Sequence, residues 1–170
     1  GRVWVASTFF SSCPHECRAM NQTIAALHHD PNLSDVVFVS ISVDPTIDTP
    51  EDLREYAKLF KADEKRWLFL TGQMADVHKL GRKLGITART KTHTARLIAL
   101  DAAGNIRGHF TYNNAAEMRK LKELLAELIE EVRPDVMHVH HWLRLTNDLV
   151  RQGAQRGVPV LLTMHDFIAS

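Results

Sequence analysis

The two cysteines are the residues of this sequence best suited to chemistry. Cys13 and Cys17 are the only cysteines among 170 residues, and both lie in the stretch SSCPHEC. A strand predicted at Val3–Phe10 runs into a helix predicted to begin near Pro14, and residues i and i+4 of a helix share one face. The exposed amides of a helix N-terminus favour thiolate over thiol. Two such thiolates can bind a soft metal, or close a disulfide across Cα atoms about 6 Å apart.

Size and composition predict one globular domain, or one domain with a short appendage. The chain is 45% hydrophobic and 24% charged, as in ordinary soluble proteins. A net charge of +1 offers no field for nucleic acid, so no nucleic-acid partner is predicted. Apolar runs reach only about seven residues, far below the ~20 needed to cross a bilayer. Two cysteines are too few for a disulfide scaffold and suit a functional site better.

Apolar periodicity predicts strands and helices in the order βαβαβαββα through residue 131. Two βαβ crossovers followed by a hairpin and a closing helix predict an α/β fold, a thioredoxin-like sandwich with a central mixed sheet flanked by helices. The carboxyl end of the first strand is where a reactive helix N-terminus lies in such a sheet, and Cys13 follows that strand. The remaining predicted strands are Val36–Val43, Trp67–Leu70, Ala95–Leu100 and Ile106–Tyr112, and the remaining helices begin at Thr49-Pro50, Met74 and Asn114.

The last forty residues add a further predicted βαβ segment. Val136–Val139 and Val158–Met164 have the composition of strands, and Leu143–Arg156 has that of a helix. A thioredoxin-like domain is already complete near Glu131. The predicted organisation is therefore a domain at 1–131 and an appended segment at 132–170.

Residues 1 to about 130 resemble the Sco/SenC family of copper-binding, thioredoxin-like proteins, which assist assembly of the binuclear copper centre of cytochrome c oxidase. The matching stretches are VWVASTFFSSCPHEC, VVFVSISVDPTIDTPEDLREYA, WLFLTG and HTARLIALDAAGNIRG. The family binds copper through the two cysteines of a C-x-x-x-C motif and a distant histidine just before the hairpin. The resemblance implies Cys13, Cys17 and His93 as ligands. Arg18 departs from the pattern, because the family usually has proline after the second cysteine.

Two thiolates and one imidazole form a soft ligand set that favours Cu(I) and can also hold Cu(II). A structural Zn²⁺ site would want a fourth ligand. Asp44, at the end of the second predicted strand, has two interpretations of equal weight. It can be an outer-shell acceptor lining the site, or a turn cap before Pro45. His15, between the cysteines, is predicted to be exposed.

Two functions follow for this domain. The first is a copper metallochaperone, not an enzyme, which holds one copper ion and hands it over by ligand exchange while both thiols are reduced. The alternative is a thiol–disulfide oxidoreductase, with Cys13 as the exposed nucleophile and Cys17 as the resolving thiol. His93 discriminates between them, because metal binding needs it and thiol exchange does not.

The resemblance also implies partners and a compartment. The partners are the copper-centre subunit of cytochrome c oxidase and a thiol reductant protein. The setting is extracytoplasmic, the periplasm for a bacterial protein. The sequence begins at Gly1 with a strand almost at once, so we expect a natural N-terminal segment to be missing and any membrane tether to lie in it.

The end of the chain resembles a different family. RPDVMHVHHWLRLTNDLVRQGAQRGVPVLLTMHD is similar to a segment of the N-terminal half of GT-B retaining glycosyltransferases. We therefore expect a chimera, and a sugar-nucleotide-binding fragment is the second alternative function. The family's nucleotide-sugar-binding domain is absent, which argues against it. His138, His140 and His141 have no thiol or carboxylate at matching spacing, so no metal site is predicted there.

Overall fold

The computed structural model describes residues 1–86, 88–91, 94–131, 137–140 and 160–163. The chain separates into two compact units, Gly1–Val132 and Arg133–Ser170. The first unit has the predicted order of elements. In chain order these are β1 (Trp4–Phe9), α1 (Glu16–His28), the 3-10 turn η1 (Pro31–Leu33), β2 (Val37–Ser42), α2 (Pro50–Lys58), β3 (Trp67–Leu70), α3 (Met74–Lys83), β4 (Arg96–Leu100), β5 (Ile106–Thr111) and α4 (Ala115–Glu131).

The five strands of the first unit form one mixed sheet in the order β3-β2-β1-β4-β5. β1 pairs in parallel with β2, and β2 in parallel with β3. β4 is antiparallel to β1 and to β5. This arrangement confirms the predicted thioredoxin-like sandwich. β1 is the central strand, so the loop that follows it begins in the middle of the sheet.

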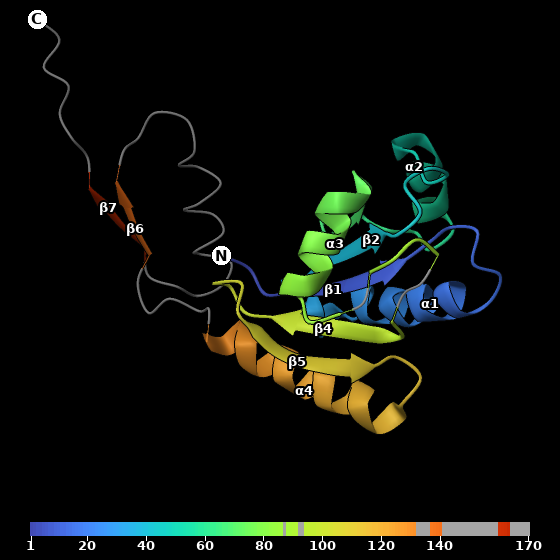
Figure 1. Ribbon diagram of the computed structural model, residues 1–170. Coiled ribbons are helices and arrows are strands. Elements are labelled where there is room, and N and C mark those ends of the chain that lie inside the picture. The colour runs from blue at the N-terminus through green and yellow to red at the C-terminus, as the bar shows by residue number, and fades with distance from the viewer. Residues whose placement is uncertain (87, 92–93, 132–136, 141–159, 164–170) are drawn as a thin grey trace, which may run out of the picture. The chain divides into compact units, whose positions relative to one another are not determined.

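Helices cover both faces of this sheet (Figure 1). α1 and α4 lie on one face, and α3 lies on the other. Alternate residues of β1 enter different cores, because successive strand side chains point to opposite faces. Val5 and Phe9 pack with α1, α2 and α4, whereas Ala6 packs with α3.

Local sequence signals set the ends of two helices. Thr49 and Asp52 form a capping box at the start of α2, with the Thr49 amide donating to Asp52 Oδ2 at 3.1 Å. α3 ends in a Schellman motif, in which Gly85 has a φ of +66° and the Ile86 amide donates to the Gly81 carbonyl at 3.0 Å. Both ends lie where the sequence predicts them.

The second unit contributes one described pair of strands. β6 (Met137–His140) pairs in parallel with β7 (Val160–Thr163). These strands fall within one residue or two of the predicted ones. The predicted helix at Leu143–Arg156 lies outside the described residues. Over the residues that the structure describes, no helix has both the length and the apolar character needed to cross a membrane.

Candidate metal centre

Cys13 lies in the β1–α1 loop and not on the helix. α1 begins at Glu16, two residues later than expected, so the prediction of a shared helical face for the two cysteines is wrong. They are brought together instead by a hydrogen bond, in which the Cys17 amide donates to Cys13 Sγ at 3.4 Å. The amides of a first helical turn have no intrahelical partner. His15, the N-cap residue, makes no capping side-chain bond, so the Cys13 sulfur satisfies one of these amides.

Cys17 is fully buried, while Cys13 is half-buried. The Phe10 amide donates to Cys17 Sγ at 3.5 Å. Burial raises the pKa of the Cys17 thiol far above its ordinary value, and the bond from Phe10 lowers it by a smaller amount. The expectation that the helix N-terminus makes both cysteines thiolates is therefore wrong for Cys17. Desolvation of the Cys17 side chain outweighs the hydrogen bond from the Phe10 amide, so its surroundings favour the neutral thiol.

Aromatic side chains surround the thiols. Tyr56 stacks on Phe9 with ring centroids 5.3 Å apart, and its hydroxyl accepts a hydrogen bond from Asn21 Nδ2 at 3.2 Å. Burial raises the pKa of Tyr56 to about 12, and the nearby Cys17 adds to the shift. Burial also raises the pKa of Tyr112, with smaller contributions from the charges of Glu16 and the cysteines. Cys17 belongs to the hydrophobic core on this face of the sheet and Cys13 packs against that core, so the thiol pair lies in an apolar setting.

Few sequence patterns predict these neighbours of the two thiols. Asn21 lies four residues after Cys17, so the helical period places both on one face. That spacing is the one sequence signal that points to Asn21. Tyr56 belongs to the apolar stripe of α2, and its approach to Cys17 depends on how α2 packs against β1 and α1.

Asp48 is a buried part of the site. Its side chain is 0% exposed, although it directly precedes Thr49, the N-cap residue of α2. Its carboxylate accepts hydrogen bonds from the Ser11 amide at 3.2 Å, from the Ser11 hydroxyl and from the Ser42 hydroxyl. Glu51 and Asp52 do lie in the first turn of α2. Asp48 therefore joins the loop before Cys13 to the end of β2.

Asp44 has the contacts of a turn residue. Thr46 Oγ1 donates to Asp44 Oδ1 at 2.9 Å, while Oδ2 lies 3.8 Å from Lys91 Nζ. The Lys91 amide also donates to the Val43 carbonyl at 3.3 Å. The turn interpretation thus has direct contacts, and the outer-shell interpretation stays a prediction. His93, two residues after Lys91, lies outside the described residues.

Comparison with known proteins decides the family. The family model described as SCO1/SenC matches residues 1–130, which is most of the chain. The chain belongs to the SCO1/SenC family.

Three members show how far the similarity extends. The SCO1 protein homolog of Bacillus subtilis is 34% identical over 74 residues, which are 42% of this chain and 38% of that protein. A SCO1/SenC family lipoprotein from Bacillus anthracis has a TM-score of 0.68 at 27% identity, covering 76% of this chain and 82% of that one. Yeast Sco1 with copper bound has a TM-score of 0.65 at 20% identity, covering 79% of each chain. The match therefore spans well under half the length of the Bacillus subtilis relative.

The described residues of this SCO1/SenC domain supply two of the three predicted ligands. Over the ranges that the structure describes, no three His, Cys, Asp or Glu side chains group closely enough to hold a metal ion. Cys13 and Cys17 are together and His93 is outside those ranges, so the complete ligand set stays a prediction. Two thiols in an apolar setting suit a soft, low-charge ion such as Cu(I). His15 is exposed, as predicted.

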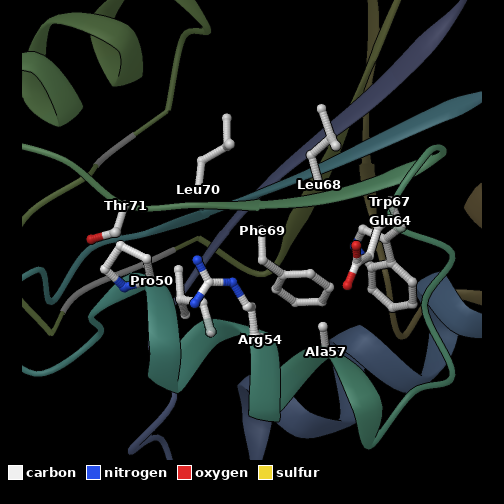
Figure 2. A pocket seen from close by; sticks show the side chains of 10 residues that line it. Pro50, Arg54, Ala57, Glu64, Trp67, Leu68, Phe69, Leu70 and Thr71 are labelled. Carbon is white, nitrogen blue, oxygen red and sulfur yellow. The ribbon is translucent and has the colours of Figure 1, made fainter.

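A groove of about 380 Å³ lies elsewhere on the SCO1/SenC domain, between α2 and the outer strand β3 (Figure 2). Trp67 and Phe69 point from β3 toward α2, while Leu68 and Leu70 point away from it. Neither Cys13 nor Cys17 lines this groove. It is therefore separate from the candidate metal centre.

Proposed function

We propose that this domain is a copper metallochaperone that binds one copper ion through the thiolates of Cys13 and Cys17 and the imidazole of His93. The observation that carries the proposal is that Cys13 Sγ accepts a hydrogen bond of 3.4 Å from the Cys17 amide, which brings the two cysteines together after the central strand. Membership of the SCO1/SenC family and the copper held by yeast Sco1 support copper as the cargo. By the same resemblance, the recipient is the copper-centre subunit of cytochrome c oxidase.

The two cysteines suit stepwise release. Cys13 is the more accessible, so an incoming ligand of the recipient displaces it first and the buried Cys17 last. Each exchange keeps copper coordinated, because a new ligand bonds before the next thiolate leaves. A thiol reductant protein would restore the dithiol after oxidation. The lipoprotein relative from Bacillus anthracis supports a membrane-anchored, extracytoplasmic setting for the parent protein.

In sequence, the proposed third ligand, His93, follows a segment that lies near the end of β2. Lys91 contacts both Val43 and Asp44, and it precedes His93 by two residues. We propose that Asp44 is an outer-shell acceptor on this side of the centre. Its Oδ2 is buried, and the only cation that the described contacts place near it is Lys91.

A Cu(I) titration of the reduced chain against a chromophoric chelator tests the proposed function. We expect one tight equivalent, and a loss of affinity of about 10- to 100-fold in His93→Ala, because an imidazole ligand is removed while both thiolates remain. His15→Ala is the control, since it also removes an imidazole and His15 is exposed in the loop that carries Cys13. Tight binding that His93→Ala leaves unchanged would point to a dithiol site and the oxidoreductase. No tight equivalent in the parent chain would overturn the metallochaperone.

Copper affinity is expected to depend on pH. Burial raises the pKa of Cys17 far above neutral, so Cu(I) must displace its proton across the whole neutral range. Each displaced proton lowers the apparent affinity by about tenfold for every unit that the pH falls. Competition titrations at three pH values between about 6 and 8, corrected for the chelator's own protonation, measure the slope. A flat profile would mean that Cys17 is already a thiolate.

The alternative function, a thiol–disulfide oxidoreductase, is supported by the same difference in burial between Cys13 and Cys17. An accessible Cys13 and a buried Cys17 are the arrangement of an attacking and a resolving thiol.

For residues 132–170 the glycosyltransferase-like fragment stays a prediction, and the family match ends before it. Binding of a nucleotide sugar in a thermal-shift assay is the observation that would support a role for that segment.

A further inference from the structure

We propose that Asp48 is the positioning residue of the thiol pair: its buried carboxylate holds the β1–α1 loop in the conformation that brings Cys13 and Cys17 together. The inference rests on the proposed function only in taking these two thiols as the working site. It concerns a residue 31 positions after Cys17 that contacts neither sulfur in the described interactions.

We call the hydrogen bonds from Ser11 and Ser42 to the Asp48 carboxylate the Asp48 clamp. Its first part acts on the β1–α1 loop. Asp48 accepts from both the amide and the hydroxyl of Ser11. Ser11 follows Phe10, whose carbonyl accepts from the Cys13 amide at 3.2 Å and whose amide donates to Cys17 Sγ at 3.5 Å. One residue next to Ser11 therefore contacts both cysteines. Restraining Ser11 therefore restrains the Cys13 backbone and Cys17 Sγ, and the Cys17 amide in turn donates to Cys13 Sγ.

The second part of the Asp48 clamp is its hydrogen bond to Ser42, which lies in the sheet. The Ser42 hydroxyl donates to Asp48, and Ser42 is the last residue of β2, in register with Phe9 of the central strand. The Ser42 oxygen accepts in turn from the Asp44 amide at 3.0 Å, and the Asp48 amide donates to the Asp44 carbonyl at 2.9 Å. The Asp48 side chain is thus held by the last residue of β2, and its backbone by the turn that follows β2. Through these hydrogen bonds, Asp48 fixes the position of the β1–α1 loop relative to the sheet.

Burial makes this clamp effective. The Asp48 side chain is 0% exposed, so water does not take the place of a protein donor at its carboxylate. Hydrogen bonds to a charged acceptor are about twice as strong as neutral ones. Asparagine has the same shape, but it lacks the charge and has one acceptor oxygen fewer. A carboxylate therefore fits this position better than its neutral isostere.

The experiment measures the redox equilibrium of the copper-free chain with glutathione. The two thiols give two electrons and two protons to glutathione disulfide, which forms the Cys13–Cys17 disulfide and two molecules of glutathione. Preorganised thiols close this bond more readily. We expect Asp48→Ala to shift the equilibrium toward the dithiol by about tenfold, and Asp48→Asn by about threefold. Copper takes no part, so the result holds or fails independently of the metallochaperone.

Asp52→Ala separates positioning from stability. Asp52 is an exposed carboxylate that closes the capping box of α2, so its removal lowers the melting temperature without touching the loop. We expect its thiol equilibrium to stay within about twofold of the parent. We also expect the effects of Ser42→Ala and Asp48→Ala on the thiol equilibrium to be non-additive, because both substitutions remove the hydrogen bond between Ser42 and Asp48.

Two results would overturn the proposal. One is an Asp48→Ala chain that melts at a lower temperature but keeps the parental thiol equilibrium, since that is the behaviour of a purely structural residue. The other is a double variant, Asp48→Ala with Ser42→Ala, whose change in the thiol equilibrium equals the sum of the two single changes in free energy. If Asp48→Ala does not fold, Ser11→Ala and Asp48→Asn carry the same test, and parental equilibria in both variants would overturn it as well.

Discussion

Cys17→Ser is expected to lower the Cu(I) affinity of the reduced chain by more than about a hundredfold, which is beyond what loss of an outer-shell partner costs a metal site. The substitution replaces a thiolate by a hydroxyl that is a poor ligand for a soft ion. Cys13→Ser is expected to have an effect of similar size, because the site then keeps a single sulfur. Competition against a chromophoric Cu(I) chelator measures both variants.

The control for this prediction is Ser12→Ala. Ser12 is exposed between the clamped Ser11 and Cys13, and it should leave the affinity within about twofold of the parent. Circular dichroism should show that all variants are folded, since serine fills nearly the volume of cysteine at position 17. Single-cysteine variants that bind Cu(I) within about tenfold of the parent would contradict a dithiolate site.

Trp67→Ala should destabilise the first unit by about 3–5 kcal/mol, the usual cost of removing a large buried aromatic side chain. Trp67 is 1% exposed, and its indole nitrogen donates to Ser40 Oγ at 3.0 Å. Its ring stacks on Phe69 with centroids 5.0 Å apart. The variant loses this packing and leaves the buried Ser40 hydroxyl without that donor. Urea unfolding followed by far-ultraviolet circular dichroism measures the loss.

Leu68→Ala is the matched control, one residue along the same strand. Leu68 is 39% exposed and points away from α2 (Figure 2). We expect a loss below about 1 kcal/mol, because little apolar surface leaves the core. Equal losses in the free energy of unfolding for Trp67→Ala and Leu68→Ala would show that the side chains of β3 are not alternately buried and exposed.

The elements of this fold are well encoded locally. α2 begins where Thr49, Pro50 and Asp52 predict it, because a capping box involves residues only three apart. β3 has the predicted bounds, Trp67–Leu70, because a run of four apolar residues between polar ones is too short for a helix. The order of such elements, with two crossovers and a hairpin, was enough to predict the mixed sheet.

The start of α1 shows where local signals mislead. Proline is accepted in a first helical turn, so the sequence predicts helix from Pro14. The structure keeps Pro14 and Cys13 in the loop, where the Cys13 sulfur accepts from the first turn and the Asp48 carboxylate holds Ser11. Ser11 and Asp48 are 37 residues apart, and no local pattern reports such a contact.

The sequence by itself determined which donor atoms are available and at which end of which strand they lie. Cys13 and Cys17 after β1, and the order of the elements around them, follow from composition, spacing and periodicity. Only the tertiary structure decided that Cys17 is buried, which raises the pKa of its thiol, and that the Asp48 carboxylate is buried between Ser11 and Ser42. The physical reason is that desolvation and buried hydrogen bonds depend on which atoms surround a group. At this site those atoms come from β1, β2, α1 and α2, which are distant in sequence and meet only in the folded chain.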